Sequence, residues 1–504
     1  MTMKRVILSL MAVAISATLV AQPRNSTQTP VEPGAPEGEA WVTTGDRSQL
    51  FAPSAQPLHF SSRAPRGTAI VIDEQHQMQS IDGFGFALTG GSAEHLINMK
   101  PAARAAILQE LYGAGEKDVR VNYLRLTLGA SDMNSFVFSY NDLPAGEEDF
   151  ELKKFSLSQD LKDVVPVTKE ILKINPNIKI MASPWSAPTW MKTNGKVKGG
   201  KLRKECYDVY ARYFVKYVQA MAAEGIRIDA VTVQNEPLNS NNTPSMVWTA
   251  ADMAEFVRDH LGPQFELAGI DTKIIVFDHN LDRPDFALEI YADSEAAKYV
   301  DGAAYHHYAG EMTTLGYMHT ARPDKHLYFT EQMTVETPGS PTIDIAAQVK
   351  RLIINVTGNW SRNVLLWNLA ADPLNDPHTD DGGCSMCQGA ITIDGDEVVS
   401  RNIAYYVVAH ASKFVDDGSV RIGSTQTGDQ SVSLFTDEQR KDVKLSVLNN
   451  NVEVLPNVAF RTPEGKIVLI VANDTYNTRS FSISHNGYSA NVQLAPGSVG
   501  TYVW

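Results

Sequence analysis

The sequence has few cysteines and no excess of positive charge. Only three of its 504 residues are cysteine, whereas a structural zinc site usually takes four ligands from two cysteine or histidine pairs. Lys and Arg number 44 against 58 Asp and Glu, which gives a formal net charge of −14. Because an acidic surface repels a phosphate backbone, we expect no nucleic-acid partner.

Long apolar runs are also missing beyond the N-terminus, so we expect no membrane span. Lys4 and Arg5 precede an apolar stretch from Val6 to Val20. Its end, at 17–21, contains small residues that offer a cleavage region. The stretch is short for a span, which needs about 20 residues, and the pattern predicts a signal peptide over 1–21. No cysteine near the cleavage region could carry a lipid anchor. We therefore expect a secreted or periplasmic protein, with a disordered, Pro- and Gly-rich lead-in at 22–40.

Two of the cysteines stand close together in Asp-Gly-Gly-Cys384-Ser-Met-Cys387-Gln-Gly, a loop composition. A redox-active pair normally opens a helix, and the Gly and Ser residues argue against that role. Export favours a local disulfide between Cys384 and Cys387. The alternative is a metal site completed by His378 and Asp381. Cys206 is then expected to be a free, buried thiol.

The middle of the chain alternates short β-rich runs with helical patterns, which indicates parallel βα units. The runs are 81–89, 122–128, 178–184, 230–237, 273–278, 302–308, 326–331 and 363–369. Eight such units fit the α/β fold class as a (β/α)8 TIM barrel, which we place at 81–412.

The remaining segments predict a second domain. After residue 412 short strands follow one another, among them 432–434, 443–448, 467–473, 481–484, 492–494 and 501–504. Turn signals such as Asn486-Gly487 separate them. This pattern predicts a β-sandwich at 413–504. Residues 41–80 carry no helical period, and we expect them to supply its N-terminal strands.

Polar and aromatic residues gather at the ends of the predicted barrel strands. They are Arg125, Trp185, Asn235, Glu236, Asp278, His279, Asn280, His306, His307, Glu331, Trp367 and Asn368. A buried parallel strand should be apolar throughout, whereas the active site of a barrel is built from the C-terminal ends of its strands. These positions therefore predict a site at the mouth of the barrel.

Glu236 and Glu331 are the candidate catalytic pair. They end the fourth and seventh strands, which lie across the barrel from each other. Carboxyl groups about 5–5.5 Å apart suit a retaining glycosidase, with Glu331 as nucleophile and Glu236 as general acid/base. Repulsion between the two is expected to keep Glu236 protonated in the resting enzyme. The structural alternative is that either Glu pairs with Arg and only braces the barrel.

No metal or organic cofactor is needed for this chemistry. His306 and His307 could suggest a metal site, but neighbouring strand residues point to opposite faces and cannot easily share one ion. We expect these histidines to belong to the active site or to the core, with their hydrogen bonds satisfied.

Several motifs taken together resemble glycoside hydrolase family 30, which includes glucosylceramidases and β-1,6-glucanases. They are Gly83-Phe-Gly, Arg125-Leu-x-x-Gly-Ala-Ser-Asp132, Ser183-Pro-Trp-x-x-Pro-Thr-Trp-Met-Lys-Thr-Asn-Gly, Gln234-Asn-Glu-Pro, Thr330-Glu, Trp367-Asn-Leu-Ala and Ser412-Lys-Phe. The resemblance implies the barrel, the sandwich and the two carboxylate roles. It also implies that Asp132, Trp185 and Trp367 line the glycone site, that Asn235 bonds the sugar 2-hydroxyl, and that Tyr308 orients the nucleophile.

The sequence departs from the glucosylceramidase pattern, which has Asp where Gly90 follows Thr89 and Trp in place of His307. The Cys384-x-x-Cys387 loop resembles the β-1,6-glucanase branch. The expected substrate is therefore a β-linked glucoside, above all β-1,6-glucan. A glucosylceramidase or exo-β-glucosidase is the nearest alternative, followed by an endo-xylanase or a non-catalytic carbohydrate-binding protein.

Overall fold

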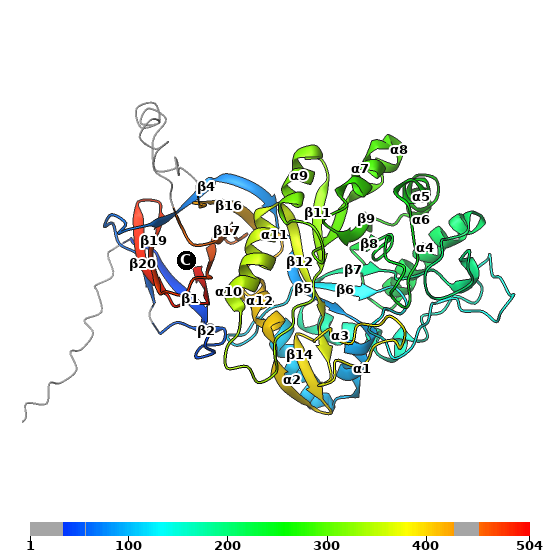
Figure 1. Ribbon diagram of the computed structural model, residues 1–504, viewed down its shortest axis with the longest axis horizontal. Helices are drawn as coiled ribbons and strands as arrows, with labels where there is room; N and C mark the ends of the chain where they lie inside the picture. Colours follow the sequence, from blue (N-terminus) through cyan, green and yellow to red (C-terminus); the bar gives the residue numbers. More distant parts are fainter. Residues whose placement is uncertain (1–33, 56, 428–452) are drawn as a thin grey trace, which may run out of the picture.

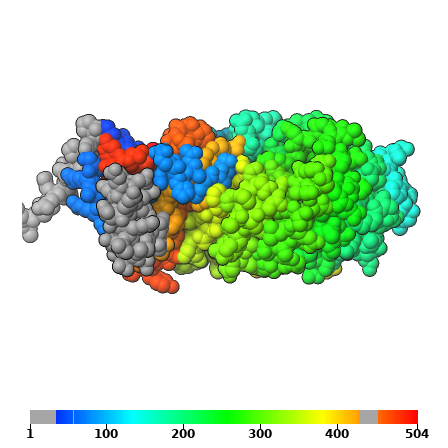
Figure 2. All heavy atoms as spheres, turned by 90° about the horizontal axis from the view of Figure 1, so that it is seen from above, coloured from blue at the N-terminus to red at the C-terminus, as the bar shows by residue number. Residues whose placement is uncertain are grey.

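A computed structural model of the chain describes residues 34–55, 57–427 and 453–504. These residues form a barrel and a sheet-rich domain that lie side by side along the long axis of the molecule (Figures 1 and 2). The proposed signal peptide and the expected strands at 432–434 and 443–448 lie outside the described residues. Among the described residues, no helix has the length and apolarity that crossing a membrane requires.

Eight parallel strands close into a barrel in chain order, which confirms the predicted fold. They are β5 (Gly83–Leu88), β6 (Tyr123–Thr127), β7 (Lys179–Ser183), β8 (Ala230–Thr232), β9 (Lys273–Asn280), β10 (Val300–His306), β11 (His326–Glu331) and β12 (Ser361–Asn368). Each corresponds to one of the eight predicted runs. β8 is shorter than predicted, because the chain leaves the ladder before Glu236, which has a positive φ of 49°.

Helices and shorter helical turns connect the barrel strands (Figure 1). The helices are α1 (Gly90–Asn98), α2 (Pro101–Tyr112), α3 (Val164–Ile174), α4 (Tyr207–Ala223), α5 (Ala250–Phe256), α6 (Gly262–Ala268), α7 (Pro284–Ala292), α8 (Ser294–Ala297), α9 (Thr313–Ala321), α10 (Ile345–Val349), α11 (Asn355–Gly358) and α12 (Ile403–Ser412). The 3-10 turns are η1 (Asp160–Lys162), η2 (Thr189–Met191) and η3 (Lys204–Cys206), and the π-helical turns are η4 (Val257–Leu261) and η5 (Lys350–Ile354).

Side chains fill the interior of the barrel below the site. Seven strands each contribute one buried residue to a common layer: Tyr123, Met181, Ala230, Ile275, Ala304, Tyr328 and Leu365. A filled interior is usual for a TIM barrel, so only the mouth can hold a ligand.

The second domain unites both ends of the described chain. Its strands are β1 (Glu37–Thr43), β2 (Ala52–Pro53), β3 (Leu58–His59), β4 (Ala69–Ser80), β16 (Val420–Ser424), β17 (Asn457–Arg461), β18 (Ile467–Asn473), β19 (Arg479–His485), β20 (Tyr488–Leu494) and β21 (Ser498–Val503). β1 pairs with β21 and β4 with β16, so the N-terminal strands join the sandwich as predicted. Residues 37–40, which we assigned to a disordered lead-in, instead begin β1. Glu37 and Gly38 pair with β3, and Glu39 and Ala40 pair with the last strand, β21.

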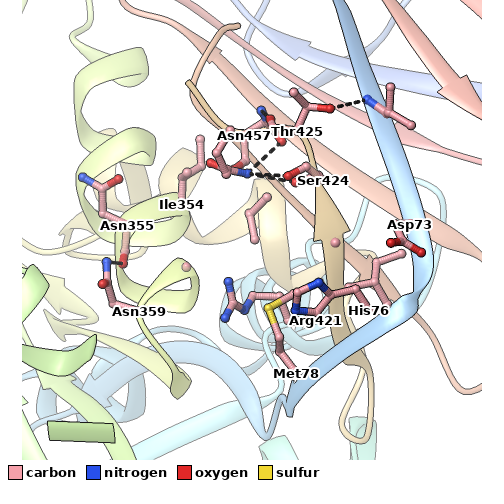
Figure 3. Close-up of a pocket in the computed structure, with 16 residues that line it drawn as sticks. Asp73, His76, Met78, Ile354, Asn355, Asn359, Arg421, Ser424, Thr425 and Asn457 are labelled. Carbon is pink, nitrogen blue, oxygen red and sulfur yellow. Dashed lines mark hydrogen bonds between the residues drawn. The ribbon is translucent and has the colours of Figure 1, made fainter. Parts of the chain in front are cut away.

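The two domains meet along α10, η5 and α12, which pack against strands of the sandwich. His410 on α12 is fully buried and makes hydrogen bonds to Thr43 Oγ1 at 2.8 Å and Thr501 Oγ1 at 2.9 Å. A cavity of about 530 Å³ remains between α11 and the strands β4 and β16, with Asn355 on one side and Asp73 on the other (Figure 3). The sandwich therefore supports the barrel from the side, and none of its described residues lines the mouth pocket.

A small sheet absent from the sequence expectations follows the last barrel strand. It consists of β13 (Ala370–Ala371), β14 (Ile391–Asp394) and β15 (Glu397–Arg401). Between β13 and β14 runs the loop 372–390, which contains a disulfide between Cys384 and Cys387. The expected disulfide is thus confirmed, and Cys206 is the free, buried thiol that we predicted.

Candidate active site

A pocket of about 430 Å³ opens at the C-terminal ends of the barrel strands. Its lining includes six of the seven residues predicted for the site: Asp132, Trp185, Glu236, Tyr308, Glu331 and Trp367. The seventh, Asn235, is buried and accepts a hydrogen bond from Arg125 through Oδ1 at 2.7 Å. Strand ends that are distant in the sequence thus converge on one cavity.

The two candidate carboxylates face each other across this pocket. Glu236, Glu331 and His306 each offer a ligand atom, and these three atoms lie within 4.8 Å of one another. One oxygen of each carboxylate is therefore within reach of a single glycosidic bond, as a retaining pair requires. Both glutamates are largely buried, at 7% and 6% exposure.

Glu236 is held by the segment that follows it and by the barrel. Its backbone N–H donates to the carbonyl of Asp278 at 2.9 Å, across the gap between β8 and β9. The amides of Asn239 and Asn242 donate to Oε2 at 2.7 and 3.3 Å. His306 Nδ1 lies 3.2 Å from Oε1. A positive φ at a non-glycine residue costs backbone energy, and such strain is typical of functional positions.

Glu331 is held by a buried cation and a phenol. Arg125 NH1 donates to Oε2 at 2.6 Å, and Tyr308 OH donates to Oε1 at 3.1 Å. The same guanidinium contacts Asp278 Oδ2 at 2.9 Å, and its side chain is fully buried. Each oxygen of Glu331 therefore has a donor that fixes its direction, and one of the two donors is Tyr308.

His306 links both carboxylates to a third acid. Its Nδ1 is 3.2 Å from Glu236 Oε1 and 3.7 Å from Glu331 Oε1, and its Nε2 is 3.1 Å from Asp278 Oδ1. A protonated imidazole satisfies acceptors on both sides at once, since both ring nitrogens then donate. Of the two open readings, a histidine of the site or of the core, the contacts of His306 fit the first, and His307 does not line the pocket.

These contacts set the protonation of the resting site. Burial raises the pKa of Glu236, but the hydrogen bond and the charge of His306 outweigh it and bring the pKa to about 2. Burial lowers the pKa of His306, and the charge of Glu331 with the bonds to Asp278 and Glu236 outweighs it, so that this pKa is about 9. Burial raises the pKa of Glu331, and the charges of His306 and Arg125 oppose the rise.

The expectation that repulsion keeps Glu236 protonated was wrong for the free enzyme. It considered only the two carboxylates, whereas the imidazole of His306 lies against both. The resting proton therefore belongs to His306, hydrogen-bonded to Glu236.

An aromatic pair and a further acid complete the pocket. The rings of Trp185 and Trp367 stack with centroids 5.3 Å apart, and the Arg125 guanidinium lies 5.0 Å from the centre of Trp185. Burial, together with the charges of Glu331 and Glu236, raises the pKa of Asp132 to about 8. The pocket thus offers apolar ring faces and a carboxyl group that is protonated near neutral pH, both of which suit a neutral sugar.

Sequence reasoning noticed Arg125, Asp278 and His306 as polar strand ends but gave them no role. The available signal was a charged residue inside an apolar strand, which rarely occurs without a partner. The partners themselves come from other strands.

Among the described residues, one group of histidine and acidic side chains could hold a metal ion, and it is Glu236, His306 and Glu331. Two of them are the candidate catalytic pair, and Arg125 and Tyr308 already donate hydrogen bonds to both oxygens of Glu331.

Comparison with known proteins agrees with this fold. The family model of the glycosyl hydrolase family 30 TIM-barrel domain matches residues 81–415, and that of the family's beta sandwich domain matches 418–502. The chain belongs to glycosyl hydrolase family 30. It is a glycoside hydrolase, and the retaining mechanism is typical of this family.

Family 30 relatives with assigned names cover nearly the whole chain. An endo-1,6-β-D-glucanase of Trichoderma harzianum is 30% identical over 476 residues, which span 88% of this chain and 94% of the relative. The lysosomal acid glucosylceramidase of Mus musculus is 28% identical over 488 residues, spanning 91% and 87%. A solved endo-β1,6-glucanase structure has 32% identity and a TM-score of 0.80, and the match covers 93% of this chain and 99% of that one.

Proposed function

We propose that the protein hydrolyses β-1,6-linked glucan by double displacement, with Glu331 as nucleophile and Glu236 as general acid/base. One structural observation carries the mechanism: two buried carboxylates, one at the end of β11 and one in the segment after β8, have oxygens within 4.8 Å of each other in a sugar-sized pocket. The similarity to endo-1,6-β-D-glucanases over most of the chain supports the substrate.

In the first step Glu331 attacks the anomeric carbon while Glu236 protonates the departing oxygen. Arg125 and Tyr308 orient the attacking carboxylate. In the second step Glu236 removes a proton from water, which attacks the glucosyl-enzyme and restores Glu331. Asn235 has its oxygen fixed by Arg125, so its amide nitrogen is available to donate to the sugar 2-hydroxyl. We assign Asp132, Trp185 and Trp367 to the glycone.

A panel of polymers tests the substrate. We expect β-1,6-glucan to be cleaved at least about tenfold faster, as kcat/KM, than β-1,3-glucan, β-1,4-glucan or glucosylceramide, because a pocket that fits one linkage loses binding energy in the transition state with another. Reducing-end assays and product sizing over time measure this. Faster release of ceramide than of glucose oligomers would favour the glucosylceramidase alternative, which the mouse relative supports.

The coupling between His306 and Glu236 predicts the pH dependence. Between pH about 2 and about 9, His306 and Glu236 share one titratable proton. The first catalytic step needs this proton on Glu236, which donates it to the departing oxygen. The alkaline limb of kcat/KM in the wild type should therefore reflect loss of that proton from the pair.

In His306→Asn the proton can reside only on Glu236, and we expect the alkaline limb to move to lower pH and kcat to fall. The neighbouring His307→Asn, outside the pocket, is the matched control and should keep the wild-type profile. An unchanged limb in His306→Asn would contradict the shared proton.

We also propose that the protein is exported, with residues 1–21 as the signal peptide. The charged start and short apolar stretch support this, and the Cys384–Cys387 disulfide is of a kind that persists in oxidising compartments.

A further inference from the structure

The disulfide lies in the wall of the active-site pocket. Both Cys384 and Cys387 line it, next to Trp367 and Trp185. Cys387 is buried and packs in a small apolar cluster that includes both tryptophans. Sulfur against aromatic rings is a favourable contact. The cross-link thus closes the side of the pocket that the aromatic pair forms.

The loop with this disulfide contacts the segment that follows Glu331. Cys387 Sγ lies 3.7 Å from Met333 Sδ. The backbone N–H of Met333 donates to Tyr308 OH at 3.1 Å, and Tyr308 OH donates to Glu331 Oε1 at 3.1 Å. A displacement of Cys387 would therefore reach the nucleophile through two intermediate groups.

The same loop contacts the segment that holds Glu236. Thr379 Oγ1 donates to the carbonyl of Thr243 at 2.7 Å, and Thr243 Oγ1 donates to the carbonyl of Asp381. Gly382, with φ of 97°, lies so close that a Cβ there would be 2.2 Å from the carbonyl oxygen of Asn241. Asn239 and Asn242, the donors to Glu236, stand on either side of this contact in the chain.

We propose that the disulfide-closed loop 379–388 is a positioning element of the hydrolase, which holds the supports of both catalytic carboxylates and the wall of the glycone pocket in register. The proposal rests on the proposed function. A loop that contains Gly382 and Gly383 has many conformations available, and the cross-link removes most of them. The ring that it closes is short, so its contribution to global stability is small compared with its effect on the loop.

The first test compares three variants. Cys384→Ser/Cys387→Ser lacks the cross-link, Met386→Ala changes an exposed residue inside the same loop, and Cys206→Ser removes the free thiol. We expect kcat/KM on an aryl β-glucoside and on β-1,6-glucan to fall about ten- to hundredfold in the double variant alone, because small displacements of reacting groups are costly. A loss of stability alone would lower the melting temperature. It would leave kcat and KM unchanged when they are measured well below that temperature.

The second test uses one protein in two states. Dithiothreitol supplies two electrons and two protons and converts the disulfide of Cys206→Ser into two thiols. We expect the same loss of activity, and recovery when the thiols are re-oxidised.

Activity within twofold of the wild type in both the double variant and the reduced protein would overturn the proposal.

Binding of a glucose-configured basic iminosugar, measured by calorimetry, separates this outcome from failure of the proposed function. If the wild type cleaves no β-glucoside, the proposed function fails, whereas an approximately tenfold weaker Kd in the double variant would still support the role of the loop. If the wild type and the double variant bind the iminosugar with the same Kd and are equally active, the loop is not a positioning element.

Discussion

Replacing Glu331 by Ala is expected to lower kcat for an aryl β-glucoside by roughly 10⁴-fold or more, because no covalent intermediate can form. Azide should restore part of this activity, since a small anion can enter the space that the carboxylate leaves. It would attack from the side of Glu331, opposite the departing group. The expected product is therefore the α-glucosyl azide, which the anomeric coupling constant in NMR identifies.

Glu236→Ala provides the complementary result. General acid/base catalysis contributes about 10²–10⁴-fold, and an aryl group that leaves easily needs little of it in the first step. The glucosyl-enzyme still forms on Glu331, and azide then attacks it from the side of Glu236. We expect the β-glucosyl azide. If the two variants gave products of the same configuration, or products opposite to those stated, the assigned roles would be wrong.

Arg125→Met is expected to lower the free energy of unfolding by about 3–5 kcal/mol. Arg125 is fully buried and contacts the carboxylates of Asp278 and Glu331, and removal of one partner leaves uncompensated buried charge. The variant should also lose activity, because Glu331 loses the donor to Oε2. Urea unfolding followed by tryptophan fluorescence measures the midpoint and slope.

The matched control is Arg212→Met, which breaks a solvent-exposed pair with Asp208 and should cost less than about 1 kcal/mol. If the stranded charge causes the loss, then Arg125→Met combined with Asp278→Asn and Glu331→Gln should recover part of the stability. A loss in Arg125→Met no larger than that of the control would contradict the buried-charge argument.

The barrel could be predicted from the sequence because its strands are buried on both faces and so appear as short apolar runs. The boundaries that failed are those where tertiary contacts override the local pattern. Residues 37–40 have the composition of a linker, and they become a strand because β3 and β21 pair with them. The π-helical turn η5 (Lys350–Ile354) lies between α10 and α11, and apolar periodicity does not reveal such a turn.

The active site also has a part that the sequence predicts and a part that it does not. Glu236 and Glu331 could be found because each is an acid at the end of an apolar run, and their pairing followed from the order of strands in a barrel. The role of His306 could not be found, since it depends on a distance of 3.2 Å to one glutamate and 3.7 Å to another, both more than 20 positions away in the chain.

The sequence by itself determined the fold and singled out the two candidate carboxylates, because apolar periodicity and polar strand ends are local properties of the chain. The other residues expected around the sugar pocket came from the resemblance to family 30. Only the tertiary structure decided which group holds the resting proton and that one disulfide loop contacts the supports of both carboxylates. Protonation depends on the charges and burial around each group, and these exist only once β6, β9, β10 and β11 have closed around the same point.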